Sequence, residues 1–165
     1  MLVILGIAAT FVVVRLGADD RRDMQREAKR LAGALEHAAA VAQWSGETLG
    51  VSAEGGVYRF WRRDGNDHWN AFADDETLAP RALPAGITVT FGLYAGAPVP
   101  PDTVLPFRAS GRNEPYSLTL ASPAGTIVVA ADPLNRVGFE PLVPVGEPAT
   151  ATSMSGGQPE MKPGR

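Results

Sequence analysis

The 165-residue chain contains no cysteine and only two histidines. Without cysteine it can form no disulfide framework, no thiolate nucleophile and no cysteine-based metal site. The histidines, His37 and His68, are far apart in the sequence and lack the spacing of metal ligands, and His37 is expected on an exposed helix surface. No Ser-His-Asp arrangement and no glycine-rich phosphate loop can be assigned. We therefore predict no enzymatic activity, no catalytic residue, no metal and no cofactor.

Two acidic segments match cation sites only in part. Residues 64–68 alternate Asp, Asn and His as a calcium loop begins, but an EF-hand needs glycine sixth and glutamate twelfth, where this chain has Trp69 and Asp75. We predict a plain hairpin turn there. The acidic run 74–76 is predicted to be a solvated loop.

Charge is absent from the first fourteen residues. Fourteen helical residues cover about 21 Å, whereas the hydrocarbon core of a bilayer is about 30 Å thick. A cleaved signal peptide needs a basic region before its apolar run, but here Arg15, Arg21 and Arg22 follow it. We therefore expect that the N-terminus is incomplete, and that an in-frame extension before Met1 encodes a basic leader and further apolar residues.

Residues 1–16 are predicted to form an apolar helix segment that is buried in a membrane, in the core of an oligomer, or in both. Left in water, such a segment would be an aggregation hazard. The side chains assigned to this membrane or filament helix are Leu2, Val3, Ile4, Leu5, Ile7, Phe11, Val12, Val13 and Val14.

Proline is also absent before Pro80, which permits one long helix over residues 2–45. In its second part, residues 17–45, apolar positions recur at steps of three and four, as in an amphipathic helix. These positions are Met24, Ala28, Leu31, Leu35, Ala38 and Ala42. Gly46 is a suitable C-terminal cap. A break near Gly17 is the alternative, but one glycine costs only about 1 kcal/mol.

From residue 46 to residue 140 the pattern predicts an antiparallel β domain. Its expected strands are 48–53, 57–63, 68–72, part of 83–94, 116–121 and 126–131. The first two form a hairpin, and the last two flank a Ser-Pro-Ala-Gly turn. A proline-rich loop is predicted over 94–104, and a disordered tail over 141–165, where proline and glycine are frequent. The predicted fold class is α+β, with the amphipathic part of the helix covering the sheet.

Several segments resemble the type IV pilin superfamily. The sequence LVILGIAAT (2–10) is similar to the second half of its N-terminal signature. The first half, with the cleavage-site glycine and the glutamate that guides filament assembly, has no counterpart in this chain. RALPAGITV (81–89) and the segment 107–137 resemble elements of H-type minor pseudopilins of the type II secretion system.

This resemblance implies a pilin-like fold and a non-enzymatic subunit near the tip of a periplasmic filament. It further implies a single-pass anchor in the bacterial inner membrane, a periplasmic globular domain, and hetero-oligomeric assembly with other pseudopilins. Secreted proteins are candidate further partners. The alternatives are a minor type IV pilin that binds DNA, and a membrane-tethered periplasmic binding domain that forms no filament.

The segment YRFWRR (58–63) distinguishes these alternatives. Its mixture of aromatic residues and arginines is typical of platforms for single-stranded nucleic acid, and the candidate contacts are Arg59, Trp61 and Arg63. The simpler interpretation is an amphipathic strand with Tyr58, Phe60 and Arg62 on the opposite face. Because the net charge is -3, we favour the strand and do not expect a nucleic-acid partner.

Overall fold

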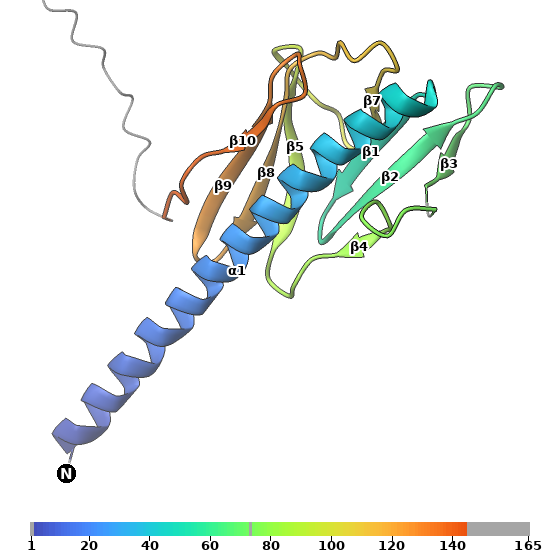
Figure 1. The fold of residues 1–165 in the computed structure, drawn as a ribbon. Helices are drawn as coiled ribbons and strands as arrows, with labels where there is room; N and C mark the ends of the chain where they lie inside the picture. Colours follow the sequence, from blue (N-terminus) through green and yellow to red (C-terminus); the bar gives the residue numbers. More distant parts are fainter. Residues whose placement is uncertain (1, 73, 145–165) are drawn as a thin grey trace, which may run out of the picture.

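The structure is a computed structural model that describes residues 2–72 and 74–144, with side chains from residue 19 onward. In this part of the chain, one long N-terminal helix is followed by ten strands in two five-stranded antiparallel sheets (Figure 1). This is the α+β arrangement that the sequence predicts.

Helix α1 runs unbroken from Leu2 to Ser45, so the predicted continuous helix is confirmed and no break occurs at Gly17. It ends where Gly46 adopts a positive φ of 72° and donates a hydrogen bond of 3.1 Å to the carbonyl oxygen of Ala42. Glycine adopts this left-handed conformation without a steric penalty, as the C-terminal cap requires.

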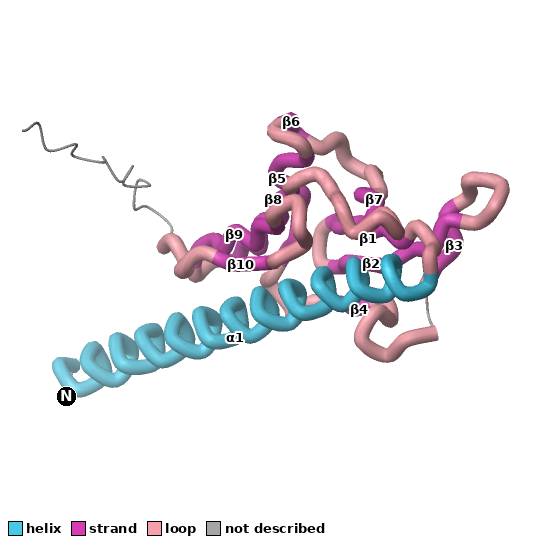
Figure 2. Tube along the Cα trace, turned by 45° about the horizontal axis from the view of Figure 1, so that its top comes forward, coloured by secondary structure: helices cyan, strands magenta, loops and turns pink. Residues whose placement is uncertain are grey.

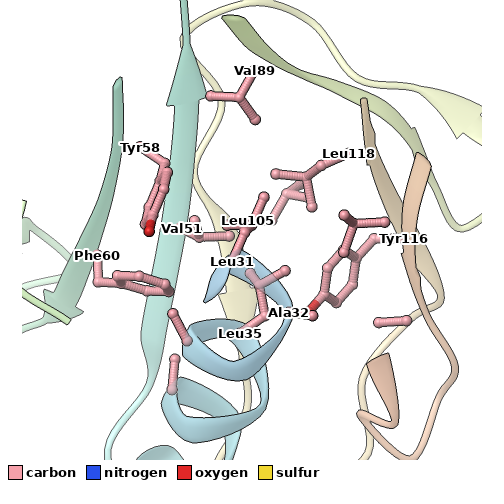
Figure 3. Close-up of a cluster of buried hydrophobic side chains, with 14 of the residues drawn as sticks. Leu31, Ala32, Leu35, Val51, Tyr58, Phe60, Val89, Leu105, Tyr116 and Leu118 are labelled. Atoms are coloured by element: carbon pink, nitrogen blue, oxygen red, sulfur yellow. The ribbon is translucent and has the colours of Figure 1, made fainter. Parts of the chain in front are cut away.

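The C-terminal part of α1 packs against both sheets, while its N-terminal part extends beyond them (Figures 1 and 2). All six residues of the predicted apolar stripe have no exposed surface. Leu31 and Leu35 point between Tyr58 and Phe60 of one sheet and Leu118 of the other (Figure 3). The stripe is therefore the shared centre of the core.

The first sheet contains β1 (Leu49–Glu54), β2 (Val57–Arg63), β3 (Trp69–Ala71), β4 (Arg81–Ala82) and β7 (Leu105–Phe107). Its order is β3-β2-β1-β7, and β4 also pairs with β2. The predicted hairpin of β1 and β2 is confirmed, with Glu54 opposite Val57 and Gly55 in the turn at a φ of 57°.

The second sheet contains β5 (Thr88–Tyr94), β6 (Ala97–Pro98), β8 (Tyr116–Ser122), β9 (Gly125–Ala131) and β10 (Val137–Phe139), in the order β10-β9-β8-β5-β6. The predicted hairpin of β8 and β9 is confirmed, and Ser122 pairs with Gly125 across its turn. The two sheets are joined directly, because the amide of Val89 donates to the carbonyl oxygen of Gly55 at 2.6 Å.

Two predicted boundaries need correction. The proline-rich segment 94–104 is not a loop throughout, since β6 lies within it at the edge of the second sheet, where proline is tolerated. Residues 141–144 belong to the β domain rather than to a tail, because Val143 forms a bridge with Thr126, with hydrogen bonds of 2.9 Å in both directions. The rest of the predicted tail, 145–165, lies outside the described residues.

Candidate interaction surfaces

The predicted membrane or filament residues, Leu2 to Val14, lie on the end of α1 that extends beyond the sheets (Figure 2). Their side chains are outside the described part of the structure. No helix in the described part combines the length and the apolar character that a membrane crossing requires.

Charged residues follow on α1, close to where the helix reaches the β domain. Asp19 and Arg22 are 3.6 Å apart, and Asp23 pairs with Arg26 in the same i,i+3 spacing. Together with Lys29 and with Phe139 of β10, they line an open groove of about 820 Å³. Phe139 is 44% exposed. This groove offers both signs of charge beside an apolar side chain.

A buried carboxylate connects α1 to the first sheet. Glu27 is only 8% exposed, and it accepts hydrogen bonds from Arg81 of β4 at 3.2 and 3.4 Å. The bidentate geometry fixes the rotation of the helix relative to β4. Burial is the main cause that raises the pKa of the neighbouring Tyr58.

His37 and Asp75 form a second connection between α1 and the segment after β3. His37 Nε2 donates to Asp75 Oδ2 at 2.6 Å, and this bond is the main cause that lowers the pKa of Asp75. The other oxygen of Asp75 accepts from the amide of Thr77 at 2.7 Å. Asp74 and Glu76 are exposed, and His37 and Asp75 are half-buried, so the expected exposed surface is confirmed in part. The pairing of His37 with Asp75 was not predicted, because a contact between residues 38 positions apart cannot be inferred from local pattern.

The turn between β2 and β3 is the plain hairpin turn predicted for residues 64–68. Asp64 Oδ1 accepts the amides of Asn66 and His68 at 2.9 Å, and these bonds lower the pKa of Asp64. Within residues 2–72 and 74–144, no group of three or more His, Cys, Asp or Glu side chains is arranged to hold a metal ion.

Strand β2 alternates as the amphipathic interpretation predicts. Tyr58 and Phe60 are buried against the core, whereas Arg59 and Arg63 are exposed and Trp61 is half-buried on the opposite face. The structure thus brings the three candidate nucleic-acid residues to one face. Arg62 points to the core side, where it makes ion pairs with Glu47 at 3.1 Å and Asp74 at 3.4 Å, and its guanidinium lies 4.6 Å from the ring centroid of Phe72.

A second tryptophan, which was not among the predicted contact residues, joins this face. Trp69 of β3 is opposite Arg63 in the register, and the Arg63 guanidinium lies 5.7 Å from the centroid of its ring. We call the outer surface of the first sheet formed by Arg59, Trp61, Arg63 and Trp69 the tryptophan face. The alternation of the predicted strand 68–72 beside β2 was the available signal.

Both indoles of the tryptophan face are held in place. Trp61 Nε1 donates to Ser52 Oγ at 2.8 Å. The Trp69 ring lies across Gly50 of β1, since a Cβ built on Gly50 would be 2.9 Å from that ring and 2.6 Å from Val104 Cγ1. Glycine at position 50 is therefore what allows the close approach of the Trp69 ring.

A long N-terminal helix that extends beyond the antiparallel sheets it packs on defines a pilin-like protein. Residues 27–157 match the model of the family described as type II transport protein GspH, and the chain belongs to this family. No curated protein sequence matches the chain.

Solved structures share this fold at low sequence identity. The minor pseudopilin EpsH of the Vibrio cholerae type 2 secretion system is 20% identical, with a TM-score of 0.56, over 76% of this chain and 99% of EpsH. GspH of E. coli is 16% identical, with a TM-score of 0.57, over 74% of this chain and 91% of GspH. The type IV minor pilin FimU of Pseudomonas aeruginosa is 16% identical, with a TM-score of 0.53, over 74% of this chain and 91% of FimU.

Proposed function

We propose that this protein is a minor pseudopilin of a type II secretion system, a non-enzymatic subunit that assembles with other pseudopilins near the tip of a periplasmic filament. The observation that carries the proposal is the family match over residues 27–157, on a chain whose helix continues N-terminal to the matched region. Similarity to EpsH supports the secretion system over other pilin-like assemblies.

The division of α1 into two parts explains how such a subunit works. From Met24 to Ala42 the helix is committed to its own β domain through a stripe with no exposed surface. The preceding apolar segment lies on the end of α1 that extends beyond the sheets (Figure 2). We infer that it forms part of a single-pass anchor in the inner membrane, with the β domain in the periplasm, and then packs among like helices in the filament.

The groove between α1 and Phe139 lies next to that transition. Its Asp and Arg side chains are more than one third exposed, and among the described residues the ion pairs that they form are two i,i+3 pairs within the helix. Such pairs contribute little to the stability of the subunit itself. These carboxylate and guanidinium groups are therefore available to pair with side chains of opposite charge on a neighbouring pseudopilin.

A minor type IV pilin that binds DNA is the second candidate. The likeness to FimU and the clustering of Arg59, Trp61 and Arg63 on one face favour it. The GspH family match favours the secretion role over it.

The anchoring role is tested by placing a charge in the apolar segment. Ile7→Lys should reduce membrane attachment, because a lysine near the bilayer centre costs about 2.5–3.5 kcal/mol; Ile7→Leu is the matched control. The measurements are membrane fractionation, co-purification with the other pseudopilins, and secretion by a host strain that lacks the native gene. Normal secretion after deletion of the gene would contradict the proposed function.

The independence of the β domain is tested by removing residues 1–16. The remaining chain should be soluble and folded by circular dichroism, because the buried stripe from Met24 to Ala42 is intact. It should lose membrane attachment. Unfolding of the shortened chain would show that the apolar segment belongs to the globular core.

A further inference from the structure

The outer faces of the two sheets differ in chemistry. On the second sheet, small and hydroxyl side chains such as Thr90, Ser117 and Thr119 occupy the positions that alternate with the core. On the first sheet, the tryptophan face presents two indoles and two guanidinium groups. Tryptophan and arginine are the residues that most often dominate protein–protein binding energy.

The tryptophan face is also rigid before any partner arrives. Trp61 is held by its hydrogen bond to Ser52, and Trp69 lies across Gly50 with the Arg63 guanidinium near its ring. Aromatic side chains that are already ordered lose little conformational entropy on binding. A fold that needed only to shield the first sheet from water would not require a glycine at position 50 to seat an indole.

The charged residues of the tryptophan face indicate which class of partner it can bind. Arg63 is paired with Asp67 at 3.2 Å, and Arg62 is turned to the other face by Glu47 and Asp74. Among the described residues, Arg59 is then the cation of this face that makes no ion pair. A nucleic-acid backbone requires a series of cations along its path, whereas one arginine beside two indoles matches a polypeptide with a carboxylate next to apolar side chains.

The orientation of the tryptophan face relative to α1 indicates where that polypeptide comes from. Tyr58 and Phe60 of β2 face α1 (Figure 3), so Arg59 and Trp61 point away from the helix. If α1 lies in the filament core, as the proposed function states, the tryptophan face is directed outward, away from the packed helices.

We propose that the tryptophan face binds an extended segment of an exported protein, one that places a carboxylate against Arg59 and apolar side chains against Trp61 and Trp69. This inference rests on the proposed function. It adds a substrate-contacting surface to a subunit whose assembly depends on α1.

Site-specific photo-cross-linking of the full chain in its host tests the proposal. A benzophenone amino acid replaces Ala71, which is exposed on β3 and opposite Trp61. The expected product joins the subunit to a protein that wild-type cells release into the medium and that cells lacking this gene retain, identified by mass spectrometry. A cross-link chiefly to another pseudopilin or to DNA, or no cross-link at all, would overturn the proposal.

Charge reversal then probes the contact without disturbing the core. Arg59→Glu should lower the yield of that cross-link at least about tenfold, as loss of a dominant contact predicts. Arg112→Glu, at an exposed arginine in the segment between β7 and β8, should change it less than about twofold. Trp69→Ala should lower the cross-link yield as Arg59→Glu does. If Trp69→Ala does not fold, the yield in Arg59→Glu is the test of the contact.

The same strains test the proposed function and the proposed binding surface separately. Deletion of the gene should stop secretion, whereas Arg59→Glu should leave co-purification with the pseudopilins intact while secretion of the cross-linked protein falls. If deletion has no effect, the proposed function fails. If deletion stops secretion but Arg59→Glu secretes normally, only the inference about the tryptophan face fails.

Discussion

The two sheets hold the same helix by different means, although both contribute to one core. The second sheet contains three seven-residue strands, β5, β8 and β9, and apart from Tyr116 the large inward side chains of β8 and β9 are aliphatic, as in Leu118, Leu120 and Val129. The first sheet has aromatic inward residues and three strands of two or three residues.

Polar connections to α1 are also unevenly distributed. The first sheet and the segment after β3 are held by side-chain pairs, Glu27 with Arg81 and His37 with Asp75. On the second sheet, Glu36 accepts a hydrogen bond from the amide of Val137 at 3.0 Å. The second sheet is a regular scaffold, whereas the first relies on specific side chains and carries the surface suited to a partner.

The largest effect is expected from shortening a core side chain in either sheet. Phe60→Ala should destabilise the chain lacking residues 1–16 by about 3–5 kcal/mol, and Leu120→Ala by about 2–5 kcal/mol, because both leave a cavity against the same helix. Denaturant unfolding should stay a single transition in each variant, since the helix and the bond from Val89 to Gly55 couple the sheets.

Two probes check that coupling. The three tryptophans lie on the helix and the first sheet, so their fluorescence follows that region, whereas far-ultraviolet circular dichroism follows both sheets. Midpoints that separate in Phe60→Ala but coincide in Leu120→Ala would show that the first sheet unfolds on its own. The β domain would then contain two separately unfolding units rather than one shared core.

Sequence pattern alone predicted the elements whose buried residues recur at a regular spacing. The helix stripe, the hairpin of β1 and β2 and the hairpin of β8 and β9 follow from spacing and turn residues alone. The short strands β4, β6, β7 and β10 were not predicted, since two or three residues carry no period. They exist because neighbouring strands supply their hydrogen bonds.

The tryptophan face was predictable only in part for a related reason. The alternation in β2 placed Arg59, Trp61 and Arg63 on one side, but Trp69 reaches that side through the pairing of β3. The connection between His37 and Asp75 depends on tertiary packing, and local sequence gives no sign of it. Side-chain pairs between distant segments are thus what the sequence analysis missed in the first sheet, the sheet that depends on them most.

A smaller loss of stability is expected from adding a methyl group at Gly50 of the first sheet or at Gly92 of the second, where neighbouring atoms lie close to the built Cβ. Gly50→Ala should cost about 1–3 kcal/mol, because the added methyl meets the Trp69 ring and Val104, neither of which can move aside freely. In Gly92→Ala the methyl meets the Ser117 hydroxyl, 2.6 Å from the built Cβ. That hydroxyl can rotate, at the loss of its bond from the amide of Leu93, so the cost should stay below about 1.5 kcal/mol.

Gly138→Ala on β10 is the control for these variants, as nothing lies within 4 Å of its built Cβ. Thermal unfolding ranks the three, and tryptophan emission should shift in Gly50→Ala alone. Equal costs at positions 50 and 92 would mean that Trp69 is not held against β1, which would weaken the case for a rigid tryptophan face.

The smallest effect concerns pH and the bond between His37 and Asp75. Because the folded state lowers the pKa of the Asp75 carboxyl, its contribution to stability is complete above the ordinary aspartate pKa near 4 and is lost as the pH falls through the lower folded value. Asp75→Asn should therefore cost about 0.5–1 kcal/mol at pH 7. Its free energy of unfolding should converge with that of the unsubstituted chain once the pH falls below the lowered pKa of Asp75 in the folded state.

Glu76→Gln is the matched control for Asp75→Asn, since Glu76 is an exposed neighbouring carboxyl that makes no ion pair with the described residues. At pH 7 the free energy of unfolding of Glu76→Gln should stay within about 0.5 kcal/mol of that of the unsubstituted chain. The absence of any deficit in Asp75→Asn at pH 7 would show that residue 75 acts through the amide of Thr77, which an asparagine oxygen can still accept, and not through His37. Convergence in acid would instead assign the connection between α1 and the segment after β3 to the ionised carboxylate of Asp75 and its bond to His37.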